Sequence, residues 1–140
     1  MSVWEWWSLA VVALCLKMWA VAMLQGQQRL KHKVFVRPED ALFFGRTEPA
    51  EQELPLVRLA AAVLRNDLEN IPCFALLALA YAQLECWPQA APWYFGAFVT
   101  SRVVHSLAYL RPTQPLRNLA YVSGLLVCAV MAAHIVWQVL

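Results

Sequence analysis

Four long apolar blocks leave this sequence few folds to adopt. They predict spans over residues 3–24, 56–84, 92–110 and 117–140. The length of each block is near or above the ~20 residues that a helix needs to cross the ~30 Å core of a bilayer. The chain of 140 residues is 61% hydrophobic and 14% charged, which is too apolar for a soluble domain of this size. We therefore expect an all-α integral membrane protein, a single domain over residues 1–140 built as a four-helix bundle.

The connections between the spans differ in positive charge. Residues 85–91 hold no Lys or Arg, whereas basic residues gather in the first loop, residues 25–55, and around the start of the fourth span. They include Arg29, Lys31, Lys33, Arg37, Arg111 and Arg117. Because cytoplasmic loops carry the excess of Lys and Arg, both basic regions are predicted to be cytoplasmic and both termini to lie on the opposite side. The sequence leaves open whether the membrane is a bacterial inner membrane or endoplasmic reticulum.

The first loop holds one further helical signal. Residues 37–45 place Pro38 where a helix can begin and Gly45 where it can end, so we expect a short interfacial helix there. The stretch 47–55 is acidic and contains prolines, and it is predicted to be a surface connection.

Several function classes are disfavoured by composition. A net charge of +2 gives no basic footprint for nucleic acid. The four cysteines, at positions 15, 73, 86 and 128, show neither a CxxC motif nor metal-ligand spacing. We expect no metal site, no disulfide and no catalytic cysteine.

A polar segment interrupts the second span. Residues 65–70 read Arg-Asn-Asp-Leu-Glu-Asn between apolar flanks. A charged residue at the centre of a membrane helix costs roughly 2.5–3.5 kcal/mol on insertion scales, so these side chains must face protein, water or ligand. The segment therefore indicates a functional site.

Other spans place polar groups at the same predicted depth. With residues 65–70 they form one set: Arg29, Arg65, Asn66, Glu69, Arg102, His105, Tyr109, Arg117 and Tyr121. Spacings of three and four residues put the members on each span on one helix face. An excess of arginine suits a small zwitterionic or polyanionic ligand, because the guanidinium fork binds carboxylates bidentately. The alternative is a set of structural ion pairs and hydrogen bonds between helices.

Two ionisable groups stand apart from this set. Lys17 lies in the middle of the first span without a local partner, and Asp67 lies on a different face from Arg65 and Glu69. We expect a structural ion pair between Lys17 and Asp67. For His134, on the far side of the fourth span, packing is the favoured interpretation.

Five motifs resemble one known family over nearly the whole chain. They are Gly26-Gln-Gln-Arg-Leu30, Phe35-Val-Arg-Pro-Glu-Asp-Ala-Leu42, Arg65-Asn-Asp-Leu-Glu-Asn-Ile-Pro72, Arg102-Val-Val-His-Ser-Leu-Ala-Tyr-Leu110 and Pro115-Leu-Arg-Asn-Leu-Ala-Tyr121. In this order they resemble the membrane-associated proteins in eicosanoid and glutathione metabolism (MAPEG). The resemblance implies a homotrimer of four-helix bundles, with glutathione as the cosubstrate, bound between adjacent subunits in the cytoplasmic half of the membrane.

The resemblance also implies a role for individual residues. The glutathione-binding set is Arg29, Arg65, Asn66, Glu69, His105, Tyr109, Arg117 and Tyr121. Glu69 would bind the ammonium of glutathione. Arg65 and a neighbouring subunit's Arg29 would bind its carboxylates. Arg102 would support the site from behind. Arg117 would stabilise the thiolate, because a nearby cation lowers a thiol pKa from about 8.5. Asp40 and Asn118 complete the catalytic candidates.

The chain departs from the family pattern at two places. Residues 57–62 read Val-Arg-Leu-Ala-Ala-Ala where the family usually has further cations, and Asn118 stands where the prostaglandin synthase branch has a serine. Arg65 before Asn66 resembles the prostaglandin synthase branch, whereas Leu68-Glu-Asn-Ile71 resembles the glutathione transferase branch, so the chain combines features of both branches.

The predicted function is a glutathione-dependent membrane transferase, with lipophilic electrophiles or lipid hydroperoxides arriving from the surrounding lipid. Three alternatives remain: a prostaglandin E synthase-like isomerase, a non-catalytic lipid-presenting protein, and a small transporter or channel subunit. The last is disfavoured because the far halves of the spans hold few polar residues.

Overall fold

The structure is a computed structural model that describes residues 1–111 and 113–140. Its elements are α1 (Val3–His32), α2 (Pro38–Asp40), the π-helical turn η1 (Ala41–Gly45), α3 (Pro55–Gln83), α4 (Ala91–Leu110) and α5 (Gln114–Val139). The described residues contain helices and no strand, so the all-α prediction is confirmed. Within them, α1, α3, α4 and α5 are the long helices, of 30, 29, 20 and 26 residues.

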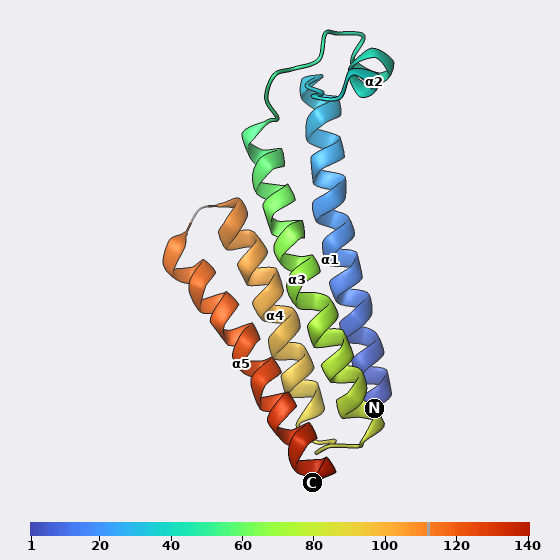
Figure 1. The fold of residues 1–140 in the computed structure, drawn as a ribbon, viewed down its shortest axis with the longest axis vertical. Coiled ribbons are helices and arrows are strands. Elements are labelled where there is room, and N and C mark those ends of the chain that lie inside the picture. Colours follow the sequence, from blue (N-terminus) through green and yellow to red (C-terminus); the bar gives the residue numbers. More distant parts are fainter. Residues whose placement is uncertain (112) are drawn as a thin grey trace.

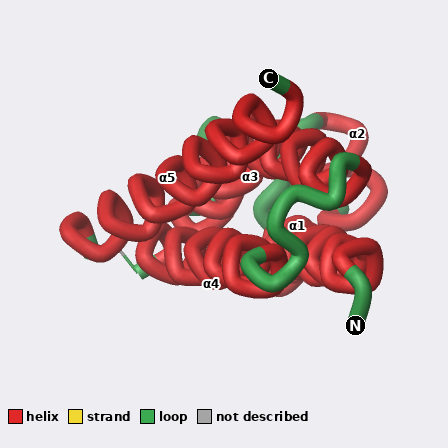
Figure 2. The backbone as a smooth tube through the Cα atoms, turned by 90° about the horizontal axis from the view of Figure 1, so that it is seen from below, coloured by secondary structure: helices red, strands yellow, loops and turns green. Residues whose placement is uncertain are grey.

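The long helices run alongside one another as an up-and-down bundle (Figure 1). The helices α3 and α4 form a central pair and contact each other. Each of them also contacts both α1 and α5. Both termini lie at one end of the bundle, called here the terminal end, and α2 lies at the other, the loop end (Figures 1 and 2). At the loop end, α1 and α3 extend beyond α4 and α5.

The first helix is longer than its apolar block. The predicted span ends at residue 24 and the predicted loop begins at residue 25, whereas α1 continues to His32. The extra residues are mostly good helix formers, and basic residues in the last turn interact favourably with the helix dipole. The helix ends at Lys33, whose left-handed backbone (φ 52°) forms the C-cap. The loop at this end therefore begins at residue 33.

The short helix expected over residues 37–45 is present as α2 and η1. Pro38 occupies the first helical position, and the left-handed Arg46 (φ 51°) follows Gly45. Phe35 is buried beneath this segment and stacks on Phe44 with a centroid distance of 6.0 Å.

A hydrophobic core fills the bundle toward the terminal end. Phe74, Tyr81, Phe95 and Phe98 are all buried and make up what we call the aromatic core. Phe74 lies flat against Phe98 with centroids 3.9 Å apart, and its ring meets Phe95 edge-on at 5.9 Å. A smaller apolar cluster of Val21, Ala60 and Val63 lies nearer the loop end.

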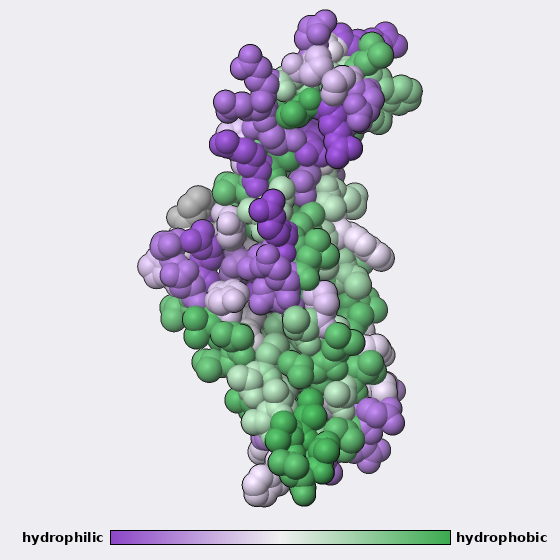
Figure 3. Space-filling view, in the orientation of Figure 1, coloured by the Kyte–Doolittle hydropathy of each residue, from purple (hydrophilic) through white to green (hydrophobic). Residues whose placement is uncertain are grey.

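The outer surface follows the same division. Hydrophobic side chains cover the terminal half of the face in Figure 3, and hydrophilic ones gather toward the loop end. In the described residues, α1 and α5 are long and apolar enough to cross a membrane by length and composition, and only 17% of the most apolar stretch of each is buried. Arg58, Arg65, Asp67 and Glu69 lower the mean hydropathy of α3, whereas α4 carries one charged residue, Arg102, among polar and aromatic ones.

Candidate functional site

A buried group of charges joins three helices at mid-bundle. Lys17 of α1 forms an ion pair with Asp67 of α3, the pairing expected from the sequence. The second oxygen of Asp67 lies 3.2 Å from Nη2 of Arg102 on α4. Asp67 is fully buried and Arg102 is 1% exposed. One carboxylate therefore pairs with two cations, the buried Arg102 and the half-buried Lys17, and the three residues form what we call the charge triad.

Arg102 also reaches two neutral side chains. Its Nη2 donates a hydrogen bond to Oδ1 of Asn66 and lies 3.4 Å from Nδ1 of His105. His105 is buried, whereas Asn66 is half-buried. Among the described residues, Nε of Arg102 has no hydrogen-bond partner. The guanidinium thus connects the charge triad to two of the expected ligand-binding side chains.

Four other candidate residues gather where α4 meets α5. The guanidinium of Arg117 lies over the ring of Tyr109, 4.9 Å from its centroid, in a cation–π contact. The His105 ring lies 5.7 Å from Tyr109 and 6.3 Å from Tyr121, between centroids. Arg117 is half-buried and Tyr121 is 38% exposed. These four residues, the α4–α5 cluster, present a cation, an imidazole and two phenols together.

Arg65 and Glu69 lie elsewhere on α3. They are one helical turn apart and both are exposed, whereas Asp67 between them points into the bundle. Across residues 1–111 and 113–140, no side-chain hydrogen bond or ion pair connects them to the α4–α5 cluster. Within the described chain, these two residues therefore have no polar link to the α4–α5 cluster.

Arg29 is already paired within its own chain. Its Nε and Nη2 donate to Oε2 of Glu53 at 2.8 and 2.6 Å. The pair closes one side of a cavity of about 400 Å³, which Asp40 also lines. Glu53 was absent from the sequence-based candidates; the acidic stretch 47–55 opposite the basic end of α1 was the signal that could have suggested it.

The remaining catalytic candidates do not meet within the described chain. Asp40 belongs to α2 and Arg117 to the start of α5, and no described ion pair joins them. Asn118 follows Arg117 and is exposed. Any action of Asp40 with Arg117 would therefore need a second chain or a movement of the loop.

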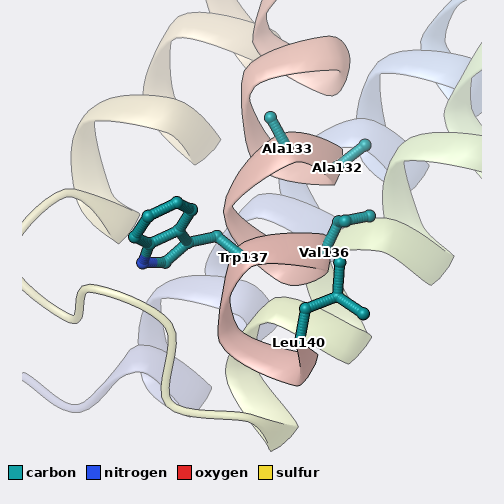
Figure 4. Close-up of a pocket in the computed structure, with 5 residues that line it drawn as sticks. All are labelled: Ala132, Ala133, Val136, Trp137 and Leu140. Carbon is teal, nitrogen blue, oxygen red and sulfur yellow. The ribbon is translucent and has the colours of Figure 1, made fainter.

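The terminal end has cavities, but few ionisable or nucleophilic side chains lie there. One of about 540 Å³ is lined by Ala132, Ala133, Val136, Trp137 and Leu140, none of which ionises (Figure 4). His134 lies nearby within 3.5 Å of the Tyr81 hydroxyl and among aromatic rings. Burial raises the pKa of the Cys86 thiol, so it is protonated at neutral pH and is a poor nucleophile. The candidate site therefore lies on the loop side of the aromatic core.

Comparison with known proteins places this chain among relatives over nearly its whole length. It is 42% identical to the horse prostaglandin E synthase over 126 residues, which are 89% of this chain and 82% of the relative. It is 38% identical to the human prostaglandin E synthase over the same shares of the two chains. It is also 38% identical to the human microsomal glutathione S-transferase 1 over 112 residues, 77% of this chain and 72% of the relative. Residues 7–137 match the MAPEG family. The chain belongs to the MAPEG family of membrane proteins.

Proposed function

We propose that this protein is a membrane enzyme that binds glutathione in the loop half of the bundle and activates its thiol against a lipophilic second substrate. The observation that carries the proposal is the α4–α5 cluster, where the Arg117 guanidinium lies over Tyr109 beside His105. The similarity of the chain to a protein named microsomal glutathione S-transferase 1 supports glutathione as the cosubstrate. The acceptor is a lipophilic electrophile or a lipid hydroperoxide drawn from the membrane.

Arg117 is proposed to stabilise the thiolate. A half-buried guanidinium is screened less by water than an exposed one, and a neighbouring cation favours the ionised form of a thiol. The contact with Tyr109 restrains the guanidinium without neutralising it, because a phenol ring carries no charge. Asn118, one residue further on, is proposed to donate a hydrogen bond to the sulfur, and Asp40 to act with Arg117.

The other binding residues are proposed to recognise the ends of glutathione. Glu69 carries the charge that an ammonium needs, and Arg65 can bind a carboxylate with two parallel hydrogen bonds. Asn66, His105 and Tyr121 supply neutral polar contacts. In this scheme Arg29 releases Glu53 and binds the second carboxylate of the peptide.

A homotrimer is proposed because one chain leaves the binding set divided. Arg65 and Glu69 are exposed on α3. Arg29 forms an ion pair with Glu53 and not with a residue of the α4–α5 cluster. A site at a boundary between subunits would bring Arg29 of a neighbouring subunit to the binding residues of this chain. Exposed charges at mid-helix in a bilayer need such a partner.

The proposed topology has four membrane crossings, α1, α3, α4 and α5. The basic residues at the loop end support a cytoplasmic location for that end, and with it for the glutathione site. Both termini at the opposite end fit an even number of crossings (Figure 1). The membrane is a bacterial inner membrane or the endoplasmic reticulum.

A second candidate is a glutathione-dependent isomerase. The 42% identity to a protein named prostaglandin E synthase favours it. The two candidates share the thiolate and differ in the second substrate. A third role, lipid presentation without catalysis, requires that glutathione does not bind.

Replacing Arg117 with Ala tests the proposal. We expect turnover of glutathione with 1-chloro-2,4-dinitrobenzene or a lipid hydroperoxide to fall by about 100-fold or more, the usual loss when a group stabilising a reacting anion is removed. The oligomer, measured by light scattering in detergent, should be unchanged. The matched control is Arg58→Ala, another arginine, exposed near the start of α3 and outside the binding set. Full activity in R117A contradicts the thiolate assignment.

A further inference from the structure

We propose that Arg102 is a positioning residue that fixes the proton of His105 on Nε2 and turns the Asn66 amide so that both side chains present N–H donors to the ligand. The inference rests on the proposed glutathione site and assigns its hydrogen-bond polarity. It begins with one atom, Nη2 of Arg102, which faces three acceptors on two helices.

The contact with His105 determines its tautomer. A guanidinium can only donate hydrogen bonds, so the 3.4 Å contact between Nη2 of Arg102 and Nδ1 of His105 is a hydrogen bond when Nδ1 accepts. A neutral imidazole with an accepting Nδ1 carries its proton on Nε2. A ring protonated on both nitrogens would point a donor at a cation, which the contact disfavours. His105 therefore offers an uncharged donor, Nε2–H, on the other side of its ring.

The contact with Asn66 sets the second donor. Because Arg102 donates to Oδ1, the amide nitrogen of Asn66 is turned away from the guanidinium with both hydrogens free for another acceptor. Asn66 is half-buried, so this nitrogen can reach a ligand. The opposite orientation of the amide would place two donors against each other.

The charge triad holds the guanidinium in place. Asp67 accepts from Nη2 at 3.2 Å and is itself paired with Lys17, so α1, α3 and α4 all restrain Arg102. Nη2 has two hydrogens for these three contacts, so a hydrogen bond to Nδ1 of His105 would share a hydrogen with Asn66 or Asp67. With 1% of its surface exposed, Arg102 does not reach a ligand directly. Its effect on binding passes through His105 and Asn66.

The chemical consequence is a preference for acceptor atoms. Two neutral donors suit a carboxylate, a peptide carbonyl or a thiolate, all of which glutathione supplies. A triad that merely braced the helices would leave the ring free to carry its proton on either nitrogen. The change in the His105 tautomer when Arg102 is replaced therefore distinguishes positioning from bracing.

Nitrogen NMR of the wild-type protein tests this directly. The protein would carry ¹⁵N-labelled histidine in lipid nanodiscs, and the signals of His105 would be assigned by their loss in His105→Asn. We expect Nδ1 of His105 to resonate as an unprotonated, pyridine-type nitrogen and Nε2 as a protonated, pyrrole-type nitrogen. A protonated Nδ1, or an exchanging mixture of tautomers, overturns the proposal. This measurement needs no variant of Arg102 and no ligand.

A variant series then measures the effect on binding. Arg102→Gln, whose amide can donate or accept, should release the tautomer into a mixture and weaken glutathione binding about tenfold, the worth of roughly one oriented hydrogen bond. Arg102→Lys keeps a donor and should recover most of both losses. The matched control is Ser106→Ala: Ser106 is buried on the same helix and bonds only the Arg102 carbonyl at 2.9 Å, so both readouts should remain at wild-type values.

The outcomes separate the two proposals. If wild-type protein fails to bind glutathione while His105 shows the Nε2–H tautomer, the proposed function is wrong and the tautomer assignment stands. If R102Q keeps both the tautomer and wild-type affinity, the positioning role is wrong whatever the protein catalyses. Should R102Q fail to fold, the wild-type spectrum and R102K decide.

Discussion

The two halves of this bundle are held together by different physics. Toward the terminal end, the aromatic core packs rings against rings, with Phe74 and Phe98 stacked at 3.9 Å. At mid-bundle, the charge triad places two cations on one buried carboxylate. Apolar packing tolerates changes of residue that keep its volume, whereas a buried charge network fails when one member is lost. The difference suggests that the aromatic core supplies stability. The charge triad and the residues on its loop side, called here the polar half, supply recognition of the ligand.

Removing the shared carboxylate should break the polar half with the largest effect. In Asp67→Ala, the buried Arg102 and the half-buried Lys17 would lose their counter-charge, and breaking a buried pair costs about 3–5 kcal/mol. We expect the free energy of unfolding in detergent to fall by that amount and glutathione affinity to fall with it. A stable D67A protein with wild-type affinity would show that the triad contributes neither stability nor recognition.

A change in the aromatic core should separate the two properties. Phe74→Leu keeps an apolar side chain but loses the stacked contact with Phe98, and we expect about 1–2 kcal/mol of stability to be lost. Glutathione affinity should not change, because Phe74 lies outside the polar half. The same unfolding and titration measurements apply. An affinity loss in F74L would mean that the two halves are coupled.

The smallest effect is expected at the loop, where a ligand must compete with an internal carboxylate. Glu53→Gln removes the charge that binds Arg29, and partly exposed ion pairs are worth up to about 1 kcal/mol. We expect glutathione affinity to rise by up to about fivefold, measured by calorimetry. Glu51→Gln is the matched control, since Glu51 is exposed in the same stretch. Weaker binding in E53Q would indicate that the Arg29–Glu53 pair shapes the site rather than blocking it.

The sequence reveals the helices more completely than the site. Apolar blocks of membrane length locate the four long helices, but they end the first one too early, because α1 continues into polar residues that hydropathy does not count. The Lys17–Asp67 pair can be predicted from helical faces. Asp67 lies on a different face from Arg65 and Glu69, and Lys17 has no local partner in its own span.

Other contacts depend on how distant segments pack. The pairing of Arg29 with Glu53 follows from the path of the loop, because the acidic stretch 47–55 indicates an acidic partner without specifying which residue it is. The contacts of Arg102 with Asn66 and His105 require the register of α3 against α4. Helical periodicity gives the face of each residue but not the atoms that meet across a helix pair.

Titration of the purified protein with glutathione tests the central claim most directly. The near-ultraviolet absorbance of a thiolate would be followed at neutral pH, where free glutathione is mostly a thiol. We expect a saturable thiolate signal with wild-type protein and, in Arg117→Ala, binding by calorimetry without that signal. The absence of glutathione binding to the wild-type protein, or an undiminished thiolate signal in R117A, would contradict the account.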